Sequence, residues 1–343
     1  MELPRQWFVA CRSDALRARP LAVQVLGRPL ALFRGPGGAP GALEDRCPHR
    51  NAPLSAGRVR GGELECPYHG WRFDGRGGCL AVPGLEAPPS AGAVRAEAFA
   101  CAEQDGYVWV WSSPGDPPPA PPPRFPWLGA RGYHTARREL TVQGSLQAAL
   151  ENTLDVPHTA YLHGGLFRTA GAGHAIEVEV RRFADRCEAV FSGEPRPSGL
   201  VGRLLAPGGG EVEHVDRFLL PSIAQVEYRL GAASHLVATT AMTPEAPGRT
   251  RLFAVVTWRL PLPGWLVRAV LTPVAGRILA QDARMLALQA ENVRRFGGER
   301  FTSTRLDVLG PQIAQLLERA ARGEAGPVGD APPEHAHRAR MVL

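Results

Sequence analysis

The sequence predicts an α+β protein, in which an all-β N-terminal domain precedes a mixed domain with an antiparallel sheet and helices. Short apolar runs separated by Gly and Pro clusters fill the first third of the chain, which is typical of β-strands. Strand-like alternation continues after that region, beside helical stretches near 144–163 and 265–296. The chain has 343 residues and is 44% apolar, so it can bury the cores of two domains.

Composition marks the expected domain boundaries. One segment is so rich in Pro that it should be extended and stiff, which suits a spacer between two packed domains. The C-terminal residues are rich in Gly, Pro and Ala without any periodicity, so we expect them to be disordered. The expected division is a first domain over 1–113, a Pro-rich linker over 114–126, a second domain over 127–322 and a disordered tail over 323–343.

The charge balance argues against a nucleic-acid partner. The formal net charge is +6, yet all 39 basic residues are Arg, which indicates a compositional bias. These Arg residues are scattered, without a dense run or interleaved aromatic residues, so nucleic-acid binding is not predicted. A basic surface can still attract an acidic protein partner by electrostatic steering.

The sequence shows no targeting or membrane-spanning segment. The N-terminus lacks a basic region followed by a long apolar run. The longest apolar stretch, 260–276, is interrupted by Arg268 and three prolines, so it should not span a bilayer. We therefore expect a soluble, cytoplasmic protein. Its six Cys residues are few and unevenly spaced, which argues against a disulfide scaffold and leaves some of them available as metal ligands.

Two matched pairs of thiol and imidazole side chains stand in the N-terminal region. The first is Cys47 with His49, and the second, after sixteen residues, is Cys66 with His69. Each pair has a proline between its members, so two loops can clamp a metal centre between them. Zn²⁺ accepts two Cys and two His, although local zinc spacings usually pair like with like. Loops that mix the two types suit a [2Fe–2S] cluster with two Cys on one iron and two His on the other.

A second group of candidate ligands opens the mixed domain. The run ENTLDVPHTAYLHGG contains Asn152, Asp155, His158 and His163. The two histidines are five residues apart, so they converge only if Pro157 interrupts the helix between them and the preceding segment. Two His and one carboxylate form the facial triad that holds non-haem Fe(II) and leaves positions open for O₂. Two surface histidines remain the alternative interpretation.

The third ligand of such a triad has to come from elsewhere, and the long C-terminal helix offers Asp282. This residue interrupts an otherwise largely apolar stripe, which comprises Leu271, Val274, Ile278, Met285, Gln289, Val293 and Phe296. An unpaired carboxylate on a core face costs several kcal/mol, and a bound cation removes that cost. A buried salt bridge to Arg is the competing explanation, and Glu291 and Asp307 are weaker candidates for the ligand.

The paired Cys and His loops, followed by Gly-Trp, resemble a Rieske iron–sulfur domain. Replacing two thiolates by imidazoles makes the cluster less anionic, and potentials then lie at roughly −150 to +300 mV rather than near −400 mV. Respiratory Rieske proteins carry a further Cys in each loop, where this chain has Ala52 and Tyr68, so the loops resemble those of oxygenases. Asn51 stands where that family often has Gly, and Trp71 either shields the cluster or packs in the core.

The spacing Asn-x-x-Asp-x-x-His-x₄-His, with a later Gln-Asp on a long helix, extends the resemblance to the oxygenase component of Rieske non-haem iron oxygenases. The resemblance implies that Cys47, His49, Cys66 and His69 hold a [2Fe–2S] cluster and that His158, His163 and Asp282 hold a mononuclear Fe(II). It also implies catalytic roles for Asp155 and Asn152. In the family an Asp at the position of Asp155 bridges an iron ligand to a cluster ligand, here His69, of the neighbouring subunit in a homotrimer.

The same resemblance implies the partners and the reaction. Electrons come from NAD(P)H through a separate reductase, with or without a ferredoxin, because this chain has no nucleotide-binding motif; RGPGGAPG is better explained as a hairpin loop. Chain length resembles that of the smaller monooxygenases, demethylases and steroid hydroxylases. We therefore expect O₂-dependent hydroxylation or demethylation of an apolar aromatic, steroid or polycyclic substrate. An arene dioxygenase, a non-catalytic Rieske electron carrier and a zinc-binding module are the alternatives. His214, His235, Met242 and Trp258 either line the pocket or simply pack in the sheet.

Overall fold

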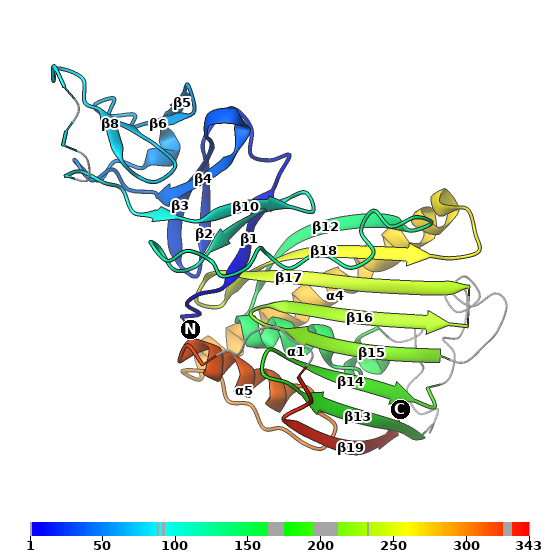
Figure 1. The fold of residues 1–343 in the computed structure, drawn as a ribbon. Coiled ribbons are helices and arrows are strands. Elements are labelled where there is room, and N and C mark those ends of the chain that lie inside the picture. The colour runs from blue at the N-terminus through cyan, green and yellow to red at the C-terminus, as the bar shows by residue number, and fades with distance from the viewer. Residues whose placement is uncertain are drawn as a thin grey trace. The chain divides into compact units, whose positions relative to one another are not determined.

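The computed structural model describes residues 2–87, 89–90, 93–163, 175–194, 212–231, 233–324 and 331–342. The chain divides into two compact units, one comprising Met1–Arg124 with Thr243–Pro247 and the other Phe125–Met242 with Gly248–Leu343. Strands alone make up the first unit, apart from two short 3₁₀ turns, whereas the second combines one large sheet with helices (Figure 1). The predicted α+β class is therefore confirmed.

The first unit contains three small antiparallel sheets. One comprises β1 (Trp7–Arg12), β11 (Tyr107–Trp111) and β10 (Cys101–Gln104) in that order; another comprises β2 (Leu21–Val25), β3 (Arg28–Arg34), β4 (Pro40–Glu44) and β9 (Ala98–Phe99). The last comprises β5 (Arg58–Arg60), β6 (Glu63–Glu65), β7 (Arg72–Phe73) and β8 (Cys79–Ala81). The glycine-rich stretch RGPGGAPG joins β3 to β4, so it is the predicted hairpin loop.

The second unit is built on an eight-stranded sheet in the order β12-β18-β17-β16-β15-β14-β13-β19. Its strands are β12 (His134–Gln143), β13 (Ala175–Arg182), β14 (Arg186–Ser192), β15 (Val212–Leu219), β16 (Ile223–Leu230), β17 (Ser234–Ala246), β18 (Arg249–Arg259) and β19 (His335–Val342). Alternate residues of β13 and β14 are buried, because one face of the sheet packs against the interior and the other meets water. The register places Phe191, His214 and Tyr228 side by side on adjacent strands.

Within the described residues of the second unit, four helices accompany the sheet, namely α1 (Leu146–Leu154), α2 (His158–Leu162), α4 (Gly264–Arg295) and α5 (Gly310–Ala321). The side chain of Ser145 caps α1 by accepting a hydrogen bond from the backbone N–H of Ala148. Figure 1 shows α1 and α4 behind the strands, and α1 contacts both β15 and β16. Among the described residues, no helix has the length and apolar character needed to cross a membrane.

Two boundaries differ from the expected ones. The Pro-rich segment belongs to the first unit as far as Arg124, because its backbone carbonyls are hydrogen-bonded there: Ala120 O accepts from Trp7 Nε1 at 2.9 Å and Pro122 O from Gln104 Nε2 at 2.6 Å. It is therefore packed against that unit along most of its length. The predicted disordered tail is wrong for His335–Val342, which forms β19 and pairs with β13. An open sheet edge supplies backbone partners that composition does not reveal; residues 325–330 lie outside the described residues.

Candidate metal centres

The two Cys-His loops of the first unit have the same backbone hydrogen bonds. In the first loop Cys47 N–H donates to Ala52 O at 2.8 Å, and Asn51 N–H donates to Cys47 O at 2.9 Å. The second loop repeats this pattern, because Cys66 N–H donates to Trp71 O at 2.8 Å and Gly70 N–H donates to Cys66 O at 3.1 Å. The two loops are therefore matched in conformation as well as in sequence.

Each loop requires a left-handed residue four positions after its Cys. Gly70 has φ +71°, and Asn51 has φ +61° at the equivalent position. Asn tolerates this region better than most residues with a side chain, and Asn51 Oδ1 also accepts a hydrogen bond from Arg46 Nε at 2.6 Å. Asn in place of Gly therefore keeps the loop geometry.

The predicted cluster ligands lie together in this unit. The thiols of Cys47 and Cys66 are buried in one apolar core, and their side chains interact directly. The rings of His49 and His69 are 4.6 Å apart between centroids, and His69 is exposed at the tip of its loop. Trp71 stacks on His49 at 4.4 Å with an interplanar angle of 5°, so its indole covers one face of this imidazole.

The donor set fits a metal cluster. Burial raises the pKa of the Cys47 thiol to about 11, although the backbone N–H groups of His49 and Arg50 favour its thiolate. His49 Nδ1 is buried and has no hydrogen-bond partner among the described residues. A buried imidazole nitrogen without a partner costs free energy, and coordination to a metal removes that cost. Two buried thiols beside two imidazoles are the ligands of a Rieske cluster.

The second centre joins α2 to α4. Pro157 ends the α1 segment and serves as the N-cap of α2, so His158 opens that short helix and His163 follows its last residue. This interruption lets the two rings converge to 5.2 Å between centroids, as the sequence predicted. Asp282 comes from the middle of α4, and its Oδ1 lies 3.0 Å from His163 Nε2 and 3.7 Å from His158 Nε2.

These three side chains fit a bound cation. One potential ligand atom from each of His158, His163 and Asp282 lies within 4.8 Å of the others. His163 Nδ1 donates to Gln281 Oε1 at 2.9 Å, so its Nε2 carries a lone pair that faces Asp282 Oδ1. Asp282 Oδ1 is buried and has no hydrogen-bond partner within the described parts of the chain. Two His and one carboxylate with facing lone pairs suit a mononuclear iron.

Asp155 orients the first histidine. Its backbone carbonyl accepts a hydrogen bond from His158 Nδ1, and its carboxylate Oδ2 lies 3.5 Å from the same nitrogen. Burial opposes the charged imidazolium, but Asp155 and Asp282 outweigh it and raise the pKa of His158 to about 9. The contact fixes the tautomer, because Nδ1 keeps its proton and Nε2 is directed toward Asp282.

A cavity of about 290 Å³ lies beside His158. Asn152 and Asp155 line it from α1 and its C-terminus, while Leu286 and Gln289 line it from α4. Its walls are mixed, because Leu154, Val156, Leu306, Val308, Leu309 and Ile313 also contribute. Burial raises the pKa of Glu151, another lining residue. All the predicted residues of the ENTLDVPH run therefore meet at one place.

The predicted apolar stripe on α4 is only partly correct. Met285 and Phe296 belong to that stripe but are exposed, whereas Leu286 and Ala290 are buried. After Asp282 the buried positions follow a spacing of four, because α1 covers that side of the helix. The weaker ligand candidates have other partners: Glu291 pairs with Arg295 at 3.8 Å, and the carboxylate of Asp307, which also lines the cavity, accepts hydrogen bonds from Thr304.

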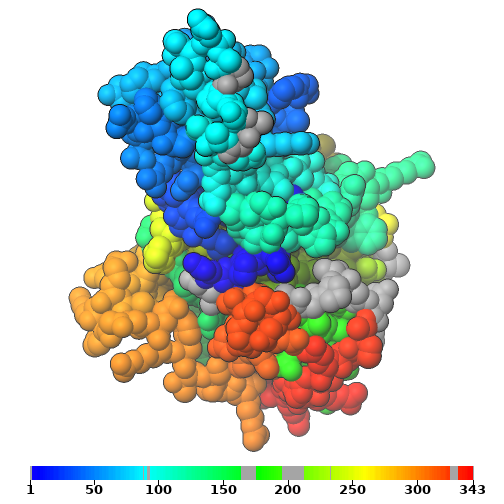
Figure 2. Space-filling model, turned by 60° about the vertical axis from the view of Figure 1, so that its left-hand side comes forward, coloured from blue at the N-terminus to red at the C-terminus, as the bar shows by residue number. Residues whose placement is uncertain are grey.

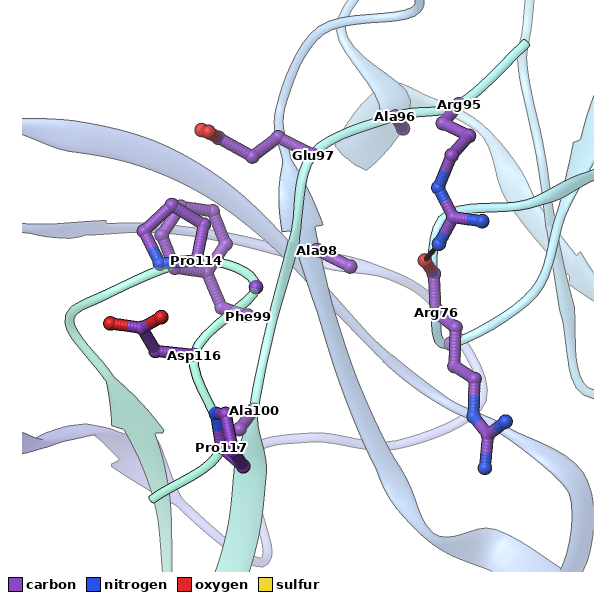
Figure 3. Close-up of a pocket in the computed structure, with 12 residues that line it drawn as sticks. Arg76, Arg95, Ala96, Glu97, Ala98, Phe99, Ala100, Pro114, Asp116 and Pro117 are labelled. Carbon is purple, nitrogen blue, oxygen red and sulfur yellow. Dashed lines mark hydrogen bonds between the residues drawn. The ribbon is translucent and has the colours of Figure 1, made fainter. Parts of the chain in front are cut away.

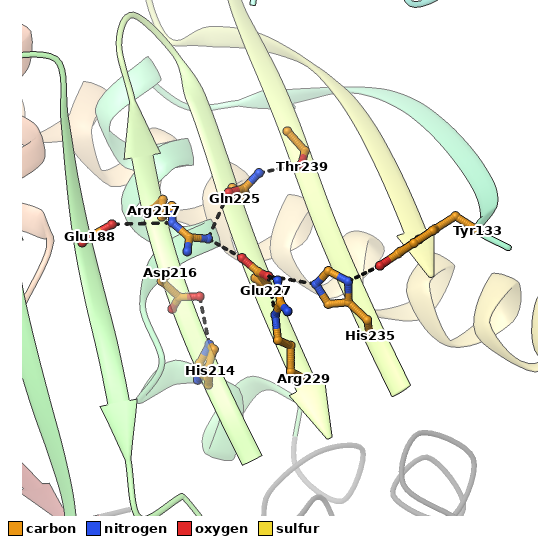
Figure 4. Close-up of polar contacts among 10 residues, drawn as sticks. All are labelled: Tyr133, Glu188, His214, Asp216, Arg217, Gln225, Glu227, Arg229, His235 and Thr239. Atoms are coloured by element: carbon orange, nitrogen blue, oxygen red, sulfur yellow. Dashed lines mark hydrogen bonds and ion pairs between the residues drawn. The ribbon is translucent and has the colours of Figure 1, made fainter. Parts of the chain in front are cut away.

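Two networks of polar side chains on the sheet contain His214 and His235 (Figure 4). His214 is 1% exposed and donates to Glu194 at 2.7 Å and to Asp216 at 2.9 Å. His235 accepts from the Tyr133 hydroxyl at 2.6 Å and donates to Glu227 at 2.8 Å. Met242 and Trp258 are buried too. None of these four residues lines any of the three cavities found among the described residues, and their roles stay predictions.

The sequence analysis included Gln281 in the Gln-Asp pattern but assigned it no role; in the structure it holds the ring of His163. Its position next to Asp282 was the available signal, because two adjacent residues of α4 contact the same imidazole. Tyr133 and Glu227 were missed as well, since their partner His235 lies on another strand and no local spacing connects them.

Comparison with known proteins agrees with both centres. Residues 6–99 match the Rieske [2Fe–2S] domain, the class defined by the two loops. Residues 142–323 match the vanillate O-demethylase oxygenase C-terminal domain, and the chain therefore belongs to this family of Rieske oxygenases. A zinc-binding module and a free-standing electron carrier do not agree with this pair of domains.

Three relatives illustrate the similarity. The oxygenase component of dicamba O-demethylase from Stenotrophomonas maltophilia is 41% identical over 161 residues, which is 46% of either chain. The vanillate O-demethylase oxygenase subunit of a Pseudomonas species is 26% identical over 93% of this chain and 94% of its own. The crystal structure of dicamba monooxygenase bound to 3,6-dichlorosalicylic acid superposes with a TM-score of 0.79, at 26% identity, over 95% of this chain and 99% of that one. The chain thus matches less than half of the length of the dicamba O-demethylase component.

Proposed function

We propose that this chain is the terminal oxygenase of a multicomponent system that uses O₂ to demethylate or hydroxylate an apolar aromatic substrate. The observation that carries the proposal is the convergence of His158, His163 and Asp282 beside the Asn152 cavity, in a chain that also has two matched Cys-His loops. Relatives named as O-demethylases favour demethylation of a methyl ether. Steroids and other polycyclic compounds remain within the substrate class.

Each ligand has a role in this proposal. Cys47, Cys66, His49 and His69 hold the [2Fe–2S] cluster, and His158, His163 and Asp282 hold the mononuclear iron. The cluster supplies single electrons, and the iron supplies O₂ activation. Gln281 holds the Nδ1 proton of His163, so the Nε2 lone pair of this ring stays directed at the metal position. Asp155 does the same for His158 through its backbone carbonyl.

Asp155 and Asn152 act at the junction between two subunits of a homotrimer. The carboxylate of Asp155 is 36% exposed, so it can contact His158 and still reach the exposed His69 of a second copy. Large apolar side chains of the second unit are also exposed, including Tyr161 (83%) on α2 and, at the two ends of α4, Trp265 (73%) and Phe296 (72%). Figure 2 shows the C-terminal part of α4 and the residues after it, in orange, as a protruding part of the surface. Exposed apolar surface of this kind suits an interface between subunits.

The electrons come from NAD(P)H through a separate reductase, with or without a ferredoxin, because the chain has no nucleotide-binding motif. The proposed dependence on NAD(P)H favours a cytoplasmic location. The apolar residues among the mixed walls of the cavity beside His158, such as Leu154, Val156 and Leu309, would contact an aromatic substrate.

The test is an O₂-dependent assay of protein whose cluster has been reduced photochemically. A panel of aryl methyl ethers, other aromatics and steroids is incubated with ¹⁸O₂, and formaldehyde and product mass are measured. We expect formaldehyde from at least one methyl ether, or a product that gains one ¹⁸O. Protein with both metals bound that consumes no O₂ and forms no product with any member of the panel would contradict the proposal. A product that gains two ¹⁸O atoms would indicate an arene dioxygenase.

A further inference from the structure

An open groove of about 680 Å³ lies in the first unit, away from both metal centres' ligands (Figure 3). Residues 95–100, which contain β9, form its wall. The β7–β8 turn at Gly75 and Arg76 and the segment 114–117 form its margins. The proposed reaction does not use this groove, so the charged residues that line it require a separate explanation.

The groove lies over the core that holds the cluster cysteines. Ala96 and Ala98 line the groove and pack in the same apolar cluster as Cys47 and Cys66. The turn that carries Arg76 is also close to the second cluster loop. Arg76 is five positions after Trp71, and five residues of extended backbone span at most about 17 Å. Trp71 is stacked on His49. The groove and the cluster cysteines therefore share one apolar core.

Two arginines are held rigidly at this margin. Gly77 has φ +81°, and a Cβ there would lie 2.0 Å from the carbonyl oxygen of Ala96, so only Gly allows the turn to pack against the wall. Ala96 N–H donates to Gly77 O at 2.9 Å. Arg95 Nη2 donates to Arg76 O at 2.6 Å, which connects the two arginine-bearing segments directly. The backbone segments that carry both guanidinium groups are thus fixed at the groove.

The charge of the groove is not balanced. Its two carboxylates are already paired with other arginines: Glu97 with Arg28 at 3.1 Å and Asp116 with Arg5 at 3.2 Å. Arg76 and Arg95 are exposed, and neither has a carboxylate partner in the part of the chain that the structure describes. Figure 3 shows these two side chains on one side of segment 96–100, and Glu97 and Asp116 on the other. The arginine side therefore presents positive charge.

We propose that this groove is the docking site of an acidic one-electron donor protein, a [2Fe–2S] ferredoxin or the equivalent domain of a reductase, with Arg76 and Arg95 as its main charge contacts. The inference rests on the proposed function, which requires a separate donor. In each encounter the donor loses one electron and the cluster gains one, without any bond being made. Docking here leaves the loop tip at His69 free for the neighbouring subunit.

Complementary charge acts mainly on the rate of association. Steering by unpaired charges raises association rates by about 10- to 1,000-fold, and the effect declines steeply with ionic strength. Charge reversal of both arginines should therefore slow cluster reduction by a protein donor most strongly at low salt. It should not slow reduction by a small molecule that needs no docking.

The test uses the full chain with its metals and an acidic plant-type [2Fe–2S] ferredoxin reduced by its flavoprotein reductase. Stopped-flow absorbance gives the second-order rate of cluster reduction for wild type, for Arg76→Glu/Arg95→Glu and for the control Arg19→Glu/Arg131→Glu. The control reverses two exposed arginines elsewhere, so both double variants have the same net charge. Reduction by photoexcited deazaflavin is measured in parallel.

We expect the groove variant to lose about 10-fold or more of the ferredoxin rate at low salt, with a flatter salt dependence. The control should lose much less, and deazaflavin rates should stay the same in all three proteins. Equal losses in both double variants, or none in the groove variant, would overturn the proposal. A change of molecular mass in light scattering of the groove variant would show instead that a second copy of the chain occupies the groove. Normal reduction by ferredoxin without any product would contradict the oxygenase function alone.

Discussion

The proposed cluster ligands and the proposed iron ligands are positioned in different ways. All four proposed cluster ligands come from two short loops within one unit, and both loops repeat the same pair of backbone hydrogen bonds. The proposed iron ligands come from α2, the residue after it and α4, and 118 residues separate His163 from Gln281, which orients its ring. A local backbone conformation therefore builds the first centre, whereas tertiary packing builds the second.

Because of this difference, we expect loss of the cluster and loss of the iron to affect the fold differently. The second cluster loop connects strands of only three and two residues, β6 and β7. The proposed iron site instead draws on a 32-residue helix that contacts β12 and on the short helix α2, which follows the sheet-packed α1. We infer that the cluster stabilises its own unit, while the iron is bound by a framework that forms without it.

The largest expected effect follows from Asp282→Ala. Removal of the third iron ligand should reduce product formation by more than about 100-fold, because even the loss of a group that supports a metal ligand costs 10- to 100-fold. The visible spectrum of the cluster should be unchanged. Product analysis together with absorbance checks this, and Glu291→Ala on the same helix is the matched control. Unchanged turnover in the Asp282 variant would reject this carboxylate as a ligand.

Cys66→Ser tests the proposed cluster site, the other half of the comparison. We expect loss of the cluster absorbance and faster amide hydrogen exchange in β5 to β8, since metal binding is coupled to folding of the loops. Exchange in α4 and iron bound at Asp282 should stay as in wild type. Increased exchange throughout both units would show that the two centres are not built independently.

Asp155→Asn should keep both metals bound and lower the turnover rate by about 10- to 100-fold. The amide keeps the backbone contact to His158 but loses the carboxylate charge that we assign to the subunit junction. The measurement is turnover alongside iron and sulfide content. Asp307→Asn, which makes the same change in another residue lining the cavity, should be nearly neutral. Normal turnover in the Asp155 variant would exclude the bridge between subunits.

The sequence predicted the locally built cluster loops more completely than the second centre, which depends on tertiary packing. The Cys-His spacing specifies the cluster loops locally, so the proximity of the two Cys and the two His could be predicted. The approach of His158 to His163 could be predicted because Pro157 marks the interruption between helices. Burial on α4 after Asp282 was predicted wrongly, because it depends on what packs against the helix. The strand β19 was missed for a similar reason, since its partner β13 is about 160 residues away in the chain.

Polar contacts should stabilise the second unit in a pH-dependent way. Burial lowers the pKa of His214, but Asp216 and Glu194 outweigh it and raise the value to about 9. Because this pKa lies above the unfolded value of about 6.5, the stabilisation is complete below pH ~6.5 and is lost as the pH rises through ~9. The difference in unfolding free energy between wild type and His214→Gln should shrink by about 2–4 kcal/mol over that range. A difference independent of pH would contradict a charged His214.

The smallest effect concerns the left-handed positions of the cluster loops. Asn51→Val places a β-branched residue at φ +61°, which should destabilise the first unit by about 1–2 kcal/mol. Asn51→Gly should be nearly neutral, since Gly70 already occupies the equivalent position of the other loop. Thermal unfolding followed by cluster absorbance distinguishes the two variants. Equal stability of the Val and Gly variants would contradict the matched loop geometry.

The most direct test of the two-centre account is the metal content of the purified protein in wild type and in Asp282→Ala. We predict about three irons and about two acid-labile sulfides per chain in wild type. The variant should retain about two irons and about two sulfides. The same iron content in both proteins, or zinc in place of iron with no sulfide, would contradict the account.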